Sequence, residues 1–363
     1  MKSTTSKIKL RDDAKYLQLV NHFASQIRGG QLRSGDRLPT FVELQELFSV
    51  TSPTVNRAMI ALEQQGLVER KRGSGVYATD YKARQKNAVI GLAGLGFQFG
   101  GRSSYWTDLL AGVREEAARR ETQIQLLDWN SSIGWEKADG VLICDWSGKF
   151  TLRHVPPGLP CVSVMVEVEG MASVVADDYS ATNEAMRHLL QLGHRRIAFL
   201  HAPEKSATAQ RLAAYRDALR EAGIAPQQKW ERLLLSSRVD SEDFVLAGNE
   251  SMTQWLQEDW STLDCTALIG QNDATAIGVA AALTKAGMRI PNDVSIVGFD
   301  GSDIGEYHSP KLTTIELPLF EIGAKAVEML SRQISADAVL AEHQVLRTHL
   351  QVRDSTSAPC EFD

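Results

Sequence analysis

The chain has 363 residues, of which 43% are hydrophobic and 23% are charged, and its formal net charge is −6. This length can bury the cores of two or three domains, and the composition is ordinary for a globular protein. Residues 1–15 lack the apolar core of a signal peptide, and no run of about 18 apolar residues predicts a membrane span. Four scattered cysteines without C-x-x-C spacing predict reduced thiols, so we expect a cytoplasmic protein with no membrane partner.

The charge is distributed unevenly along the chain. Residues 1–86 carry 15 Lys and Arg against 8 Asp and Glu, which gives +7. The remainder carries 39 − 15 = 24 against 45 − 8 = 37, which gives −13. A basic head on an acidic body indicates that the head meets a polyanion and that the body does not.

The head begins with a pattern of three helices. Apolar residues recur at helical spacing between residues 16 and 27, and two glycines follow at 29–30. Thr40 and Glu43 match an S/T-x-x-E capping box, which opens a second helix. A third helix is expected from about residue 52 until just before Gly66. We expect two short strands to follow, at residues 67–69 and 76–78, with a basic, glycine-containing turn between them.

This order predicts an α+β winged helix-turn-helix, which binds double-stranded operator DNA through the third helix and the wing. Asn56 is suited to the N6 and N7 atoms of adenine, and the cations and glycines of the wing are suited to phosphates or the minor groove. A small helical domain used for dimer contacts is the alternative. The predicted DNA-binding residues are Thr40, Thr51, Ser52, Thr54, Asn56, Arg57, Arg70, Lys71, Arg72, Gly73, Ser74 and Gly75.

The segments YLQLVNHFASQI, GGQLRSGDRLPT and TSPTVNRAMIALEQQGLVERKRGSGVYA together resemble a GntR-type winged helix over residues 16–79. The resemblance implies a DNA-binding fold. Val42, Ser52 and Asn56 stand where the family usually places DNA-facing arginines. The guanine-rich operator that is usual for the family is therefore not expected here.

Short apolar strands alternate with helices after a polar linker at residues 80–87. The alternation runs twice, from AVIGLAGL to CVSVMV and again from RIAFLHA to VSIVGFD. Strand–helix alternation indicates parallel sheets with crossover helices, so we predict an α/β body of two lobes with a ligand cleft between them.

The strings DDYSATNEAMRHLLQLGHRRIAFL, TALIGQNDATAIGVAAALTKAGMRIPNDVSIVGFD and SPKLTTIELPLFEIGAKAVEML resemble the effector-binding core of LacI-type regulators, which is akin to periplasmic sugar-binding proteins. The resemblance covers about residues 88–354 and implies three crossings between the lobes, near 175–178, 301–312 and 333–344. The domains are thus expected at 1–79 for the head and 88–354 for the effector-binding body, with a tail at 355–363. The lobes are predicted at 88–176 with 313–333, and at 177–302 with 343–354. NSSIGWEKA leaves no room for the full helix that the family has between its second and third strands.

The same resemblance implies effector contacts at Tyr105, Trp106, Asp145, Arg211 and Asp273. An arginine is suited to carboxylate or vicinal hydroxyl oxygens, and the aromatic residues to stacking on the ligand. The alternatives are an ion pair for Arg211, a helix N-cap for Asp273 and core packing for Tyr105. Polar residues that many relatives have are replaced by Met165 and Leu317, so the wall of the first lobe is expected to be less polar.

We therefore expect a homodimeric transcriptional regulator, a repressor, controlled by a sugar or sugar derivative. A nucleoside or another metabolite, and activation by ligand, are the alternatives. An enzyme is disfavoured: GLAGLGFQFGG only faintly matches a dinucleotide-binding loop, and there is no P-loop and no H-E-x-x-H. We expect no catalytic residue, no cofactor and no metal. A binding protein without DNA function is disfavoured by the wing.

Overall fold

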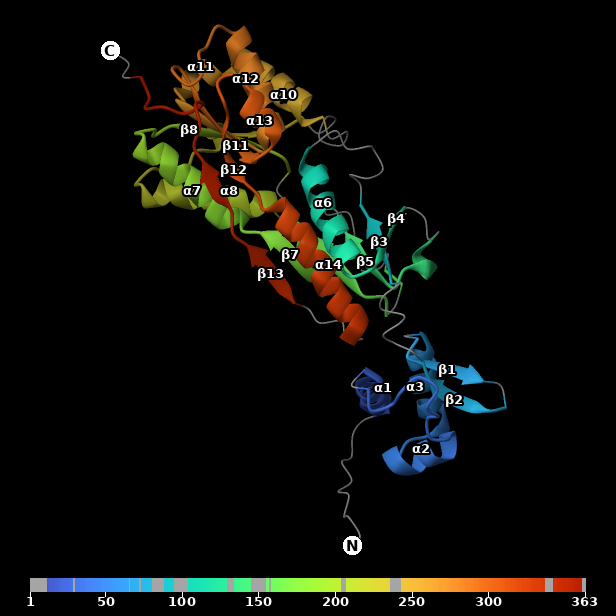
Figure 1. The fold of residues 1–363 in the computed structure, drawn as a ribbon. Helices are drawn as coiled ribbons and strands as arrows, with labels where there is room; N and C mark the ends of the chain where they lie inside the picture. The colour runs from blue at the N-terminus through green and yellow to red at the C-terminus, as the bar shows by residue number, and fades with distance from the viewer. Residues whose placement is uncertain are drawn as a thin grey trace.

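The computed structural model describes residues 12–28, 30–64, 66–71, 73–79, 88–94, 104–128, 134–144, 155–156, 158–203, 207–235, 243–336 and 342–360. These residues form a helical head with a hairpin and a body with two six-stranded sheets (Figure 1). No helix within these ranges is both long and apolar enough to cross a bilayer.

The head contains the three predicted helices and the hairpin, with the bounds α1 Asp12–Arg28, α2 Phe41–Phe48, α3 Ser52–Gln64, β1 Val68–Lys71 and β2 Gly75–Ala78. Their apolar faces meet in one core, in which Leu19, Leu44 and Leu62 have no exposed surface. The hairpin is antiparallel, with Val68 opposite Ala78. The main chain of residues 35–38 bonds to β2 and extends this small sheet, since Leu38 N donates to Val76 O at 2.9 Å. The predicted winged helix-turn-helix is confirmed.

The first lobe has the strand order β13-β7-β6-β5-β3-β4, and its paired strands are parallel. Its strands are β3 Val89–Ala93, β4 Gln123–Leu127, β5 Gly140–Ile143, β6 Cys161–Val164, β7 Ala172–Ala176 and β13 His343–Leu346. Helices α6 Ser104–Arg119 and α14 Leu319–Ala336 pack on this lobe and on each other. They approach closely because Gly112 faces the carbonyl of Phe320 and Gly323 faces that of Leu109.

Between β4 and β5 the described residues contain the short 3-10 helix η1 Trp135–Lys137. Trp135 is buried there, and it packs with Leu127 and Ile143 on one face of the sheet. The prediction that the full family helix is missing is therefore confirmed for residues 134–138, while 129–133 lie outside the described residues.

The second lobe has the strand order β14-β12-β11-β10-β8-β9. Its strands are β8 Ile197–His201, β9 Glu231–Leu233, β10 Ala267–Gly270, β11 Ser295–Asp300, β12 Thr313–Glu316 and β14 His349–Gln351. Its helices are α7 Asp178–Gln191, α8 Ala207–Glu221, η3 Gln228–Trp230, α10 Phe244–Glu258, α11 Trp260–Leu263, α12 Asp273–Lys285 and α13 Asp303–Tyr307. The pairs are parallel except for β14, which runs antiparallel to β12. The α/β prediction is confirmed for both lobes.

Two of the three predicted lobe crossings are wrong. The first, near residues 175–178, is confirmed, because β7 lies in one sheet and α7 follows in the other lobe. β12 still pairs with β11 of the second lobe, so the chain crosses after Glu316 and not at 301–312. β13 pairs with β7 of the first lobe, so the last crossing follows Leu346. Thr314 and Ile315 of β12 are buried in the second lobe. The sequence pattern does not specify which sheet this strand joins.

Residues 355–360, predicted as part of a tail, belong to the second lobe. The Ser355 hydroxyl donates to the carbonyl of Ile296 at 2.6 Å and accepts from the amide of Thr313 at 2.8 Å. Ser357 O is 2.8 Å from His194 Nε2, which is buried beneath it. Cys360 Sγ also donates to the carbonyl of Asn292 at 3.1 Å, so the folded body extends to at least residue 360.

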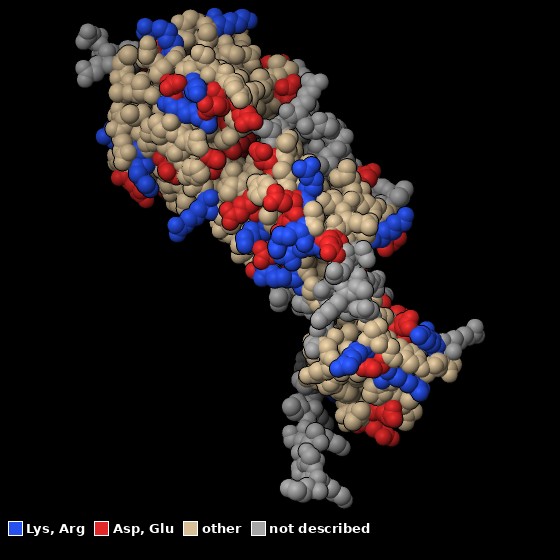
Figure 2. Space-filling model, in the orientation of Figure 1, with Lys and Arg blue, Asp and Glu red and all other residues tan. Residues whose placement is uncertain are grey.

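Charged side chains of both signs alternate on the face of the body that carries α14 (Figure 2). Lys325 pairs with Glu328 at 3.0 Å, and Arg332 pairs with Glu342 at 3.1 Å. On α6, Glu116 accepts from both Arg119 and Arg120. Each of these three acidic side chains is therefore paired with at least one cation.

Candidate DNA-binding surface and effector cleft

The turn that presents the third helix is fixed by hydroxyl groups. The capping box is present as predicted: Thr40 N donates to Glu43 Oε2 at 2.7 Å, and the Thr40 hydroxyl accepts from the Glu43 amide. These bonds lower the pKa of the Glu43 carboxyl. Thr51 and Thr54, at the start of α3, join their hydroxyls at 2.9 Å. Three of the predicted DNA-binding residues are thus brought to the start of α3, since Ser52 is exposed between the two threonines.

The exposed face of α3 contains Asn56 and Arg57, and each is held by another element. The Arg57 guanidinium lies over the ring of Tyr16 from α1, 4.1 Å from its centroid. Arg70 of the hairpin donates to Asn56 Oδ1 at 3.2 Å and to Asn56 O at 3.3 Å, and its Nε is 3.1 Å from Glu63. The recognition helix and the wing are therefore joined through side chains that sequence reasoning treated as separate.

The wing itself is a tight turn. Ser74 N donates to Lys71 O at 2.8 Å, and the Ser74 hydroxyl is 2.6 Å from that of Tyr77. Gly73 has φ 74°, a left-handed conformation that favours glycine. Lys71 is exposed but pairs with Glu69 at 2.7 Å, which raises the pKa of Lys71. Arg72 lies outside the described residues.

Arg37 is a cation near the wing that sequence reasoning missed. Its main chain bridges to Tyr77, and its guanidinium lies beside Gly75, where a side chain on residue 75 would collide with it. Because residue 75 is a glycine, there is room beside the wing for the Arg37 side chain, which comes from the loop before α2. Arg37 is exposed, so it adds a positive charge to the surface of the wing. The GDRLPT motif contains this arginine, but no spacing rule places it against residue 75.

The candidate effector-binding residues of the second lobe surround a buried ion pair. Arg211 of α8 is 5% exposed, and Asp178 at the start of α7 is 3% exposed. Arg211 Nε donates to Asp178 Oδ1 at 2.7 Å, and its Nη1 donates to Gln271 O, after β10, at 2.6 Å. The guanidinium also covers the Phe299 ring at 3.5 Å from the centroid. The ion-pair alternative for Arg211 is confirmed.

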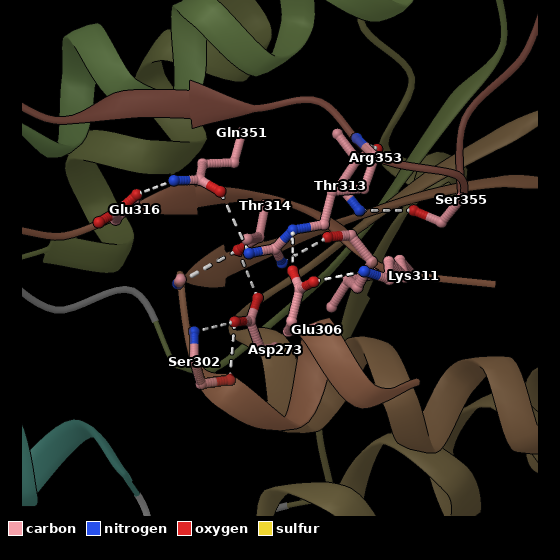
Figure 3. Close-up of polar contacts among 12 residues, drawn as sticks. Asp273, Ser302, Glu306, Lys311, Thr313, Thr314, Glu316, Gln351, Arg353 and Ser355 are labelled. Atoms are coloured by element: carbon pink, nitrogen blue, oxygen red, sulfur yellow. Dashed lines mark hydrogen bonds and ion pairs between the residues drawn. The ribbon is translucent and has the colours of Figure 1, made fainter. Parts of the chain in front are cut away.

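Asp273 is held inside the second lobe and has no exposed surface. Its carboxylate accepts from the Thr314 hydroxyl at 2.5 Å, and from the amide and the hydroxyl of Ser302 at 2.6 and 2.8 Å (Figure 3). The cap of α12 is Asn272, which accepts from Thr275 N, so the N-cap alternative for Asp273 is wrong. We therefore assign Asp273 to fixing the turn after β11, in place of the predicted effector contact.

Asp300, the last residue of β11, is the functional candidate that sequence reasoning missed. Its φ is 117°, which is a strained value for any residue other than glycine. Burial, together with repulsion from Asp273, raises the pKa of Asp300 well above its usual range. Burial also raises the pKa of Asp273 to about 6, against the lowering effect of its three hydrogen bonds. The available signal was the VSIVGFD string, which ends in a carboxylate at a strand terminus.

The first lobe contributes Tyr105 and Trp106 at the start of α6. Their rings meet edge to face with centroids 5.2 Å apart, and Trp106 is buried while Tyr105 is half-buried. Burial raises the pKa of Tyr105, Asp300 raises it further, and Arg211 opposes the shift. Tyr105 of the first lobe is therefore within electrostatic reach of Asp300 and Arg211 of the second. The predicted Asp145 lies outside the described residues.

Met165 and Leu317, which replace expected polar groups, are both buried. Met165 follows β6 with φ 70°, an uncommon conformation for a residue with a side chain. Leu317 lies where the chain leaves β12 for the first lobe. The less polar wall of the first lobe stays a prediction. Among the described residues, no three His, Cys, Asp or Glu side chains are grouped to hold a metal ion.

Comparison with family models matches residues 15–78 to bacterial regulatory proteins of the gntR family and residues 186–356 to a periplasmic binding protein-like domain. The arabinose metabolism transcriptional repressor of Geobacillus stearothermophilus is 25% identical, over 94% of this chain and 97% of that protein. The HTH-type transcriptional repressor CytR of Escherichia coli K12 is 30% identical over 57% of this chain. The chain spans 58% of the CytR length.

Among solved structures, the transcriptional regulator CelR–cellobiose complex aligns over 93% of this chain and 99% of that one, with a TM-score of 0.66 and 23% identity. That identity shows the fold alone. A LacI family transcriptional regulator from Mycobacterium smegmatis aligns over 74% of this chain and 99% of that one, at 25% identity and a TM-score of 0.65. Residues 15–78 therefore match the gntR family of bacterial regulatory proteins, and they are joined to a periplasmic binding protein-like domain that aligns with a LacI-family regulator.

Proposed function

We propose that this protein is a transcriptional repressor whose affinity for operator DNA is controlled by a small polyhydroxylated metabolite bound between the two lobes. The observation that carries the proposal is the position of Tyr105 on one lobe, stacked edge to face on Trp106 and close enough to Asp300 and Arg211 on the other lobe for their charges to shift its pKa. A stacking ring together with a carboxylate and a guanidinium suits a ligand with an apolar face and a rim of hydroxyls. A sugar has both features.

The relatives support a sugar in particular. One aligned repressor is named for arabinose metabolism, and one aligned structure contains cellobiose. A nucleoside remains the second candidate, because Met165 and Leu317 are apolar where polar effector contacts were expected, and an apolar wall would suit a base.

Control of DNA binding would follow from closure of the lobes. The chain crosses between the lobes after Ala176, Glu316 and Leu346, and these short crossings allow one lobe to rotate against the other. Ligand that bridges Tyr105 and Asp300 favours the closed form, and a coupling of about 1–3 kcal/mol is sufficient for regulation. We further propose a homodimer on a two-fold operator, because one winged helix contacts too few bases for genomic specificity.

The test is a thermal-shift screen of pentoses, hexoses, disaccharides and nucleosides on the full chain, followed by DNA binding with and without the hit. A ligand at 100 times its Kd adds about 2.7 kcal/mol to stability. We expect Asp300→Asn to abolish the shift while DNA binding persists. Asp293→Asn is the matched control, because Asp293 is paired with Arg289 on the surface. Equal ligand shifts in both variants, or tighter DNA binding with ligand, would contradict the proposal.

A further inference from the structure

The contact between Arg70 and Asn56 joins the hairpin to the exposed face of α3. Arg70 Nη1 donates to the side-chain oxygen of Asn56, and Nη2 donates to its main-chain oxygen, at 3.2 and 3.3 Å. Glu63, two helical turns further along α3, holds the third nitrogen at 3.1 Å. The guanidinium is thus fixed at three points along one edge of the helix.

A guanidinium has donors and no acceptor, so the Asn56 amide must turn its oxygen toward Arg70. The amide NH₂ then points away from Arg70. Among the residues that the structure describes, no acceptor is placed within hydrogen-bond distance of that NH₂. Asn56 is exposed, so the group it offers to a DNA groove is a donor.

This orientation changes the base that Asn56 is suited to read. The bidentate adenine contact needs the amide oxygen to accept from N6 while the NH₂ donates to N7. With the oxygen turned toward Arg70, the NH₂ best matches a base that presents two adjacent acceptors in the major groove. Guanine does so through O6 and N7, whereas thymine presents O4 alone beside its methyl group. Adenine offers this NH₂ a single acceptor beside a repelling donor.

We propose that Arg70 is a positioning residue, which fixes the Asn56 amide with its NH₂ toward the DNA so that α3 selects an acceptor edge, guanine, at one position of each half-site. The proposal rests on the proposed function, since it needs the head to bind DNA by sequence. It replaces the adenine contact that the amide alone predicted.

The test is selection of bound duplexes from a random pool by the full-length protein, with Arg70→Met, Asn56→Ala, the double variant and Lys71→Met. Wild type is expected to select guanine at one position roughly 5- to 150-fold over adenine, the range of a good base contact. Arg70→Met should lose that preference or move it to adenine, Asn56→Ala should lose it, and the double variant should match Asn56→Ala. Lys71→Met should weaken binding to all sequences and keep the base preference.

A further variant, Asn56→Asp, tests which side-chain atom of residue 56 faces the groove. Asn56→Asp keeps an oxygen for Arg70 but replaces the NH₂ with another oxygen, so it should reject guanine in favour of cytosine, whose N4 donates. Unchanged guanine selection by Asn56→Asp or by folded Arg70→Met, verified by thermal unfolding, would overturn the proposal. Adenine selected by wild type would overturn it too. A wild type that selects no sequence would instead overturn the proposed function.

Discussion

The candidate DNA-binding surface of the head and the candidate effector site of the body each contain an arginine–carboxylate ion pair. The pair in the head is exposed to water, and the pair in the body is buried. In the head, Arg70 is 31% exposed in its pair with Glu63, whereas in the cleft the Arg211 side chain is 7% exposed in its pair with Asp178. An exposed pair contributes little to stability because water screens it, while a buried charge depends on its partner. The comparison indicates that the exposed Arg70 can orient Asn56 at little effect on stability, and that the buried Arg211 holds the second lobe together.

The largest predicted effect is at Arg211. Arg211→Ala leaves the buried Asp178 carboxylate without its partner, so we expect a loss of about 3–5 kcal/mol in the free energy of unfolding by urea. Arg220→Ala, on the same helix, removes an exposed pair with Asp217 and is expected to cost less than about 1 kcal/mol. If the two variants were equally stable, Arg211 would be a ligand contact without a structural role, and the contrast between the head and the cleft would fail.

The second prediction concerns the pH dependence of the cleft. Folding raises the pKa values of Asp273 and Asp300 above those in the unfolded chain. At a pH between the unfolded and the folded pKa values, the folded state therefore binds more protons than the unfolded chain. Their contribution to stability is present below about pH 3.8 and is lost as the pH rises through the folded pKa values. For Asp273, a rise to about 6 corresponds to roughly 3 kcal/mol.

Asp300→Asn removes the repulsion between the two carboxyls. We expect the variant to gain stability relative to wild type as the pH rises from 4 to 7, measured by urea unfolding at each pH. Asp293→Asn is the control, because its exposed ion pair lowers the pKa of Asp293 to about 2 and keeps it ionised over this range. A difference between Asp300→Asn and wild type that did not change with pH would show that the two carboxyls do not repel each other.

The elements of both regions could be predicted from the sequence, because periodicity and capping are local. Thr40 and Glu43, three positions apart, mark the start of α2, and α7, α8 and α12 follow their apolar spacing. The crossings could not be predicted in the same way. Whether β12 stays in the second sheet depends on its pairing with β11, and a strand of four residues carries no signal for its neighbour.

Functional side chains were predicted less completely, for a physical reason. The roles of Asp273 and Asp300 depend on which carboxyl is hydrogen-bonded and which is strained, and this is decided by Ser302 and Thr314 from other elements. Arg70 was predicted as a contact to phosphates or the minor groove. Its bond to Asn56 joins residues fourteen positions apart, and no spacing rule predicts it.

The third prediction tests the capping box of the head. Thr40→Ala removes the hydroxyl that accepts from the Glu43 amide, so we expect a loss of about 1 kcal/mol in the local stability of α2. Hydrogen exchange of the α2 amides in the full chain measures it, and Thr40→Ser is the control that keeps the hydroxyl. Faster exchange in both variants would show that the methyl group, and not the cap, stabilises this turn.

The smallest effect is expected at the stack of Arg57 on Tyr16. Tyr16→Leu keeps an apolar side chain beneath the guanidinium but removes the cation–π attraction, which is worth about 0.5–1 kcal/mol at an exposed site. Because Arg57 is predicted to contact a phosphate, Arg57→Ala should weaken binding to all operators alike and reduce the slope of log affinity against log salt by about 1. Tyr16→Leu should weaken binding less and leave that slope unchanged, since the charge remains. A change in base preference with either variant would place Arg57 on a base edge, and the head would then read sequence with a cation as well as with Asn56.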